Sequence, residues 1–66
     1  MKSYRIYIIG RDGRLQLGQA FQGQDDAAAT AIARAAATPG QTLELWEGGR
    51  LVGRVSEDGG FTPGNS

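Results

Sequence analysis

The sequence predicts an α+β fold in which one helix covers one face of a four-stranded antiparallel sheet. A single alanine-rich stretch, residues 25–38, has helical periodicity and lies near the middle of the chain. Two segments with the apolar pattern of strands precede it and two follow, and each pair is joined by a glycine-containing turn. The element order is therefore β-β-α-β-β. A right-handed crossover, with the first strand between the second and third, gives the spatial order 2-1-3-4.

The first hairpin is predicted from residues 4–9 and 14–22, which flank Asp12-Gly13. Asp-Gly between alternating apolar residues is a strong indication of a two-residue hairpin turn. That turn fixes the register and with it the face of each side chain. The face toward the helix receives three predicted pairs: Tyr4 with Phe21, Ile6 with Gln19, and Ile8 with Leu17. The other face receives Arg5 with Ala20, Tyr7 with Gly18, and Ile9 with Gln16.

The predicted helix has both start and stop residues. Asp25 can cap its first turn, and Asp26 places negative charge at the positive end of the helix dipole. Thr38-Pro39-Gly40 ends it, because proline cannot continue the hydrogen-bond ladder. The face predicted to be buried consists of Ala29, Ile32, Ala33 and Ala36. Such small side chains bury little area, so the sheet must supply most of the core.

The second hairpin is predicted from residues 41–47 and 50–55 around Gly48-Gly49, with two possible registers. A two-residue turn would pair Leu43 with Arg54, and a three-residue loop would pair Leu43 with Val55. We favour the loop because it keeps Arg54 out of the core and forms a Glu44–Arg54 ion pair across the strands. It also places Val52 beside Trp46.

Residues 1–56 are predicted to form a single domain, and residues 57–66 a disordered glycine-rich tail. Seven basic and seven acidic residues cancel, so net charge implies no attraction to nucleic acid or membrane. The absence of cysteine and histidine excludes disulfides and Cys/His zinc sites. No apolar run of membrane-spanning length and no signal peptide is found, so we expect a cytoplasmic protein without a membrane role.

Catalysis is not expected. The serines (Ser3, Ser56 and Ser66) lie at the ends of the predicted fold without an adjacent base. The glycines from Gly48 to Gly53 lack the Lys-Ser or Lys-Thr of a phosphate-binding loop and do not open a helix. We therefore expect no enzyme activity, no cofactor and no bound metal.

The helix-free face of the sheet is the predicted site of function. Its predicted surface residues are Arg5, Tyr7, Ile9, Glu44, Trp46, Val52 and Arg54. Apolar patches of this kind usually mark interfaces, so we expect a small interaction module that forms a homodimer through this face. A different protein or peptide could instead add a strand at the edge of the second or fourth strand. Single-stranded nucleic acid is the other alternative, with bases stacking on Tyr7 and Trp46.

Residues 4–55 also resemble a group of short uncharacterised alphaproteobacterial proteins of β-β-α-β-β order. The resemblance rests on these segments: Tyr4-Arg5-Ile6-Tyr7, Arg11-Asp12-Gly13-Arg14, Phe21, Asp25-Asp26 with the alanine-rich helix, Leu43-Glu44-Leu45-Trp46-Glu47-Gly48, and Arg50-x-Val52-x-Arg54-Val55. This chain differs in having alanine where larger aliphatic residues are usual on the helix, and in its glycine-rich tail. The resemblance implies a bacterial, cytoplasmic, non-enzymatic protein and supplies no activity and no site residues.

Overall fold

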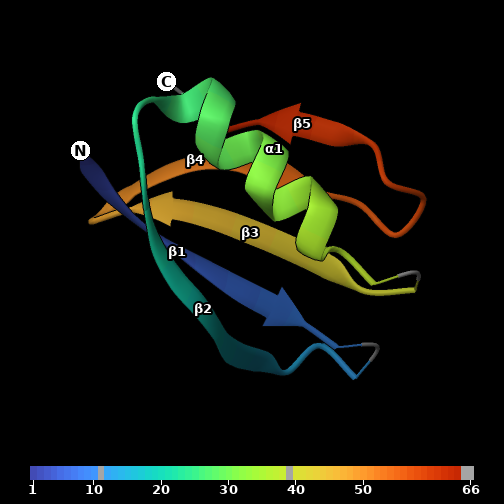
Figure 1. Ribbon diagram of the computed structural model, residues 1–66. Helices are drawn as coiled ribbons and strands as arrows, with labels where there is room; N and C mark the ends of the chain where they lie inside the picture. The colour runs from blue at the N-terminus through green and yellow to red at the C-terminus, as the bar shows by residue number, and fades with distance from the viewer. Residues whose placement is uncertain (11, 39, 65–66) are drawn as a thin grey trace.

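The computed structural model describes residues 1–10, 12–38 and 40–64, and it confirms the α+β class (Figure 1). The helix α1 (Asp26–Ala36) lies across one face of an antiparallel sheet. The strands are β1 (Lys2–Ile9), β2 (Leu15–Gly23), β3 (Thr42–Glu47), β4 (Arg50–Val55) and β5 (Phe61–Pro63). Their order is β2-β1-β3-β4-β5. The sheet therefore has one strand more than the four that the sequence predicted.

The additional strand, β5, comes from the segment that was predicted to be a disordered tail. In its described part, residues 57–64, the chain turns back and pairs Phe61 with Val55 and Thr62 with Arg54. The Ser56 hydroxyl and the Gly60 backbone N–H both donate to Asp58 and hold the turn. Phe61 packs against the core beside Gly53, where a β-carbon would lie within 2.2 Å of its ring. Residues 65–66 of the predicted tail lie outside the described residues.

The hydrophobic core lies between α1 and the sheet. Its buried residues are Tyr4, Ile6, Ala29, Ala33, Leu43, Leu45, Val52 and Val55. Ala29 and Ala33 are fully buried, so the helix contributes methyl groups and the sheet contributes the bulk, as predicted. The predicted helix face is wrong at two positions, because Ile32 is 38% exposed and Ala36 is exposed. Ala37, just beyond the helix, packs against the core instead.

The helix begins as predicted, with the Asp25 carboxylate accepting from the Ala28 N–H at 2.8 Å. It ends at Ala36, and the Ala37 N–H donates to the carbonyl of Arg34. Pro39, which was predicted to end the helix, lies outside the described residues.

In the half of the first hairpin nearer the turn, the observed strand register differs from the predicted one. Tyr4 pairs with Phe21 as predicted, but Tyr7 pairs with Leu17 and Ile9 with Leu15. The Gly13 N–H donates to the Gly10 carbonyl and Gly13 has a positive φ, which lengthens the turn by one residue. A bulge in β2 at residues 18–19, opposite Ile6, restores the register. Leu17 therefore lies on the helix-free face and not in the core.

The second hairpin also contains a bulge, but its turn has two residues. Gly48-Gly49 forms a two-residue turn, with Glu47 paired to Arg50 and a positive φ at Gly48, as a type II′ turn requires. A bulge at Val52 then shifts the register, so that Leu45 pairs with Gly53 and Leu43 with Val55. Each of the two predicted registers is thus correct for one part of the hairpin. The predicted pairing of Trp46 with Val52 is wrong, because Trp46 pairs with Leu51.

A polar cluster joins the start of α1 to the sheet. The Tyr4 hydroxyl and the Arg50 guanidinium both donate to Asp26 Oδ1, each at 2.9 Å, and Arg50 also pairs with Glu47. Arg50, and then Tyr4, lower the pKa of Asp26 from its ordinary value. Burial, followed by the bond to Asp26, raises the pKa of Tyr4 to about 12. The ionised carboxylate is therefore the form that the fold favours.

Candidate functional site: the helix-free sheet face

The helix-free face is formed by side chains that alternate with the core residues along each strand. Tyr4 and Ile6 point to the core, so Arg5 and Tyr7 point away from it. Residues that pair with Arg5 and Tyr7 across the neighbouring strands place their side chains on the same face. The large or charged side chains that share this face are Arg5, Tyr7, Ile9, Leu15, Leu17, Glu44, Trp46, Leu51 and Arg54.

Six of the seven predicted surface residues lie on this face, and Val52 does not. Val52 is 8% exposed and belongs to the core, because the β4 bulge turns it and Gly53 toward α1. Leu51 takes the position opposite Trp46.

Two residues of β2 that were not predicted there, Leu15 and Leu17, also lie on this face. They are 60% and 66% exposed. The available signal was Gly18 within a strand, because an isolated glycine there often marks a bulge. A β-carbon at Gly18 would lie 2.7 Å from the Ile6 carbonyl oxygen, so the close approach at this bulge requires glycine.

Two aromatic residues form the centre of the helix-free face. The rings of Tyr7 and Trp46 meet edge to face, with centroids 6.4 Å apart and an interplanar angle of 88°. Such a pair contributes about 0.5–1.5 kcal/mol beyond the area it buries. Tyr7, Leu15, Glu44 and Trp46 line a shallow hollow of about 230 Å³ at this point. The centre of the face is thus apolar and slightly concave.

Glu44 connects the aromatic centre to the charged rim. Its carboxylate accepts from the indole N–H of Trp46 at 3.2 Å and from Arg54 at 2.7 Å. The predicted Glu44–Arg54 ion pair is therefore confirmed. These bonds hold the indole in one orientation and occupy the charge of Arg54.

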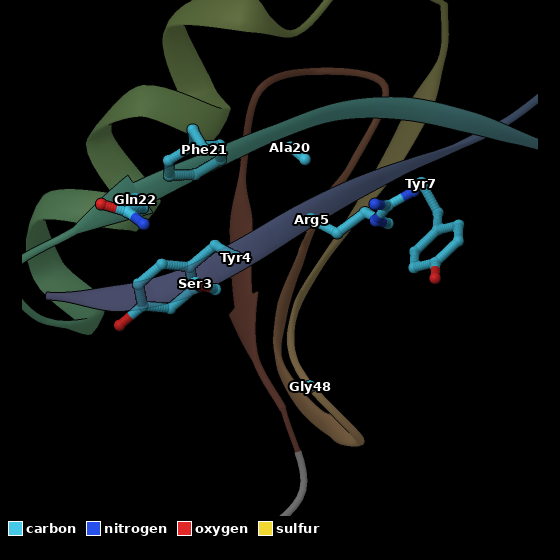
Figure 2. Close-up of a pocket in the computed structure, with 8 residues that line it drawn as sticks. All are labelled: Ser3, Tyr4, Arg5, Tyr7, Ala20, Phe21, Gln22 and Gly48. Atoms are coloured by element: carbon cyan, nitrogen blue, oxygen red, sulfur yellow. The ribbon is translucent and has the colours of Figure 1, made fainter.

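A second hollow lies on the same face toward the start of β1, with a volume of about 450 Å³ (Figure 2). Its lining residues are Ser3, Tyr4, Arg5, Tyr7, Ala20, Phe21, Gln22 and Gly48. Arg5 supplies the only charge among them, and its guanidinium extends along β1 toward Tyr7 (Figure 2). Ala20, which pairs with Arg5 across the strands, adds only a methyl group to the lining.

The described residues contain no group of three or more acidic, histidine or cysteine side chains placed to hold a metal ion. No helix among them is long and apolar enough to cross a bilayer.

Comparisons with known proteins give no relative from which a role could be transferred. The chain matches no family model, no curated protein and no solved structure.

Proposed function

We propose that this protein is a small, non-catalytic bacterial interaction module of the cytoplasm that forms a homodimer through the helix-free face. The observation that carries the proposal is the exposure of Leu15 and Leu17 beside the Tyr7–Trp46 pair. Contiguous apolar side chains on one face, with polar groups at the rim, are typical of a surface that another protein covers.

The molecule is just large enough for a dimer through one face. Its dimensions are 33 × 22 × 19 Å, so the outline of its broadest side is somewhat smaller than the roughly 800 Å² per partner of a standard interface. Some of the described polar groups on this face are already hydrogen-bonded to one another within the monomer. Glu44 is bonded to both Trp46 and Arg54, so its burial would not leave an unpaired carboxylate.

The small core provides a second argument. A chain of 66 residues without cysteine has little area to bury and no disulfide to stabilise it. Only two helix residues, Ala29 and Ala33, belong to the buried core. Burying the leucines and aromatics of the opposite face would add stability that the monomer lacks.

Light scattering over a concentration series tests the proposal, with Trp46 fluorescence read on the same samples. We expect twice the monomer mass and a blue-shifted Trp46 emission that returns to the red on dilution. Leu17→Gln and Trp46→Ala should each weaken the association. Ile32→Gln is the matched control, because it changes an exposed apolar residue on the helix side of the molecule. A monomer at every concentration, with red and quenchable emission, would refute the homodimer.

Single-stranded nucleic acid is the second candidate for the same face, because Arg5 lies beside two aromatic residues there. It is the less favoured candidate, since Arg54 already pairs with Glu44 and each aromatic ring packs against the other. A shift assay at low salt distinguishes the two. Binding that weakens steeply as salt is added would support nucleic acid.

A further inference from the structure

Arg5 differs from the other arginines that the structure describes. Arg14, Arg50 and Arg54 each form an ion pair with an acid, and Arg34 donates to the Gly59 carbonyl. Within the described residues, no acid or carbonyl is bonded to Arg5. The two acids of β3, Glu44 and Glu47, are already paired with arginines of β4. Arg5 is only half-buried, so its charge remains accessible from the hollow that it lines.

The lining of this hollow is positive and contains no competing carboxylate. Ser3 and Gln22 add a hydroxyl and an amide, which are neutral hydrogen-bond donors. Tyr7 and Ala20 provide apolar surface, whereas the ring of Phe21 stacks on Tyr4 on the covered side of the sheet (Figure 2). Three other surface hollows each contain at least one acid, which is Glu44 in one and Glu57 with Asp58 in the other two. Their carboxylates would oppose an anion, whereas the lining described for the Arg5 hollow would not.

We propose that the Arg5 hollow binds an organic carboxylate with a small apolar body. The planar guanidinium can donate two parallel hydrogen bonds to the two oxygens of a carboxylate. A single cation balances one negative charge, whereas a phosphate dianion is usually met by a helix N-terminus or several cations. The volume of about 450 Å³ lies within the range of small-molecule pockets. This proposal uses the helix-free face but does not require the protein to self-associate.

Benzoate is the probe for the test, because it joins a carboxylate to a flat apolar ring. Amide resonances of the full-length protein are followed by ¹⁵N NMR while benzoate is added at constant ionic strength. We expect saturable shifts at Arg5 and at its neighbours Ala20 and Gln22. Benzamide, which has the same shape without the charge, should cause no such shifts, and phenyl phosphate should bind no better than benzoate.

Variants distinguish recognition of benzoate by Arg5 from nonspecific binding to the helix-free face. Arg5→Gln should weaken benzoate binding by roughly tenfold to a hundredfold, the range for losing a hydrogen bond to a charged group. Arg5→Lys should restore part of the affinity, because it keeps the charge but loses the planar fork. Arg14→Gln is the matched control, since Arg14 is highly exposed on the first hairpin and outside the hollow.

Three results would overturn the proposal: equal shifts with benzamide, unchanged affinity in Arg5→Gln, or tighter binding of phenyl phosphate. Light scattering on the same samples keeps this proposal separate from the proposed function. A monomer that binds benzoate through Arg5 would refute the homodimer and support the carboxylate site. A dimer that does not bind benzoate, and whose monomeric Leu17→Gln variant does not bind it either, would do the reverse.

Discussion

The two faces of the sheet carry similar residue types in very different environments. Leu45 on the covered face is 1% exposed, whereas Leu17 on the helix-free face is 66% exposed. Val52 and Leu51 are neighbours in β4, yet a bulge turns Val52 into the core and leaves Leu51 opposite Trp46. The comparison teaches that strand register, more than side-chain hydrophobicity, decides which residues stabilise the fold and which are left for a partner.

The largest effect is expected from truncating matched leucines on the two faces. Leu45→Ala should lower the free energy of unfolding by about 2–5 kcal/mol, since it leaves a cavity in the core. Leu17→Ala should change the unfolding free energy of the monomer by no more than about 0.5 kcal/mol, because its side chain is already in water. Urea unfolding at a concentration where the protein is monomeric measures both. Equal losses would contradict the assignment of the faces.

The next effect concerns the contact between β4 and β5. A β-carbon at Gly53 would lie 2.2 Å from the Phe61 ring, so Gly53→Ala should displace that ring. We expect a loss of about 1–3 kcal/mol, as for other overpacked sites. Gly49→Ala is the control, because nothing lies within 4 Å of a β-carbon there. In the background of Phe61→Ala the cost of Gly53→Ala should shrink without vanishing, because the Thr62 carbonyl oxygen would still lie 2.8 Å from the β-carbon. An undiminished cost would contradict the contribution of the Phe61 ring.

The β4 bulge itself can be tested with a pair of threonines. Val52→Thr should cost about 1–2 kcal/mol, because it places a hydroxyl in the core without a ready partner. Leu51→Thr should leave the stability of the monomer nearly unchanged and weaken only the proposed dimer. Thermal unfolding and light scattering measure the two properties. The opposite result would restore the continuous register that the sequence suggested, with Val52 beside Trp46.

The smallest effect is the acid dependence of the polar cluster at the helix start. The pKa of Asp26 is lowered in the folded protein, so its contribution to stability is present in full above its ordinary value of 3.8. That contribution is lost as the pH falls through the lowered pKa. Arg50→Gln should flatten the dependence below pH 4 more than Tyr4→Phe does, because Arg50 is the larger cause of the shift. Denaturant unfolding at several acidic pH values provides the measurement, and identical slopes in all three proteins would contradict it.

Much of the fold follows from local patterns that the sequence displays directly. The Asp25 cap, the two hairpins, the antiparallel sheet and the Glu44–Arg54 pair were predictable from neighbouring residues. The two bulges were not, because the pairing at the open end, Tyr4 with Phe21 or Leu43 with Val55, is the same whether one extra residue lies in the turn or in a strand. A one-residue slip moves every side chain to the opposite face, which is why Leu17 and Val52 were misassigned.

The fifth strand was missed for a different reason. Its sequence, Phe61-Thr62-Pro63, is short and lies among glycines, so composition predicts disorder. Its pairing depends on Gly53, a residue in another strand that leaves room for the Phe61 ring. This fit between two strands cannot be inferred from either segment alone. The candidate site was predictable to the extent that it depends on β1 and β3, whose alternation is regular.

The two edges of the sheet differ as much as its two faces. β2 presents nine residues without a charge or a proline, whereas β5 presents three residues and ends in Pro63. A long uncharged edge can accept another strand, and a short edge with proline resists it. Of the two described edges, β2 is therefore the one that could accept another strand. Pairing of two copies through β2 would leave only the short β5 edge at each end of the joined sheet, which disfavours further growth.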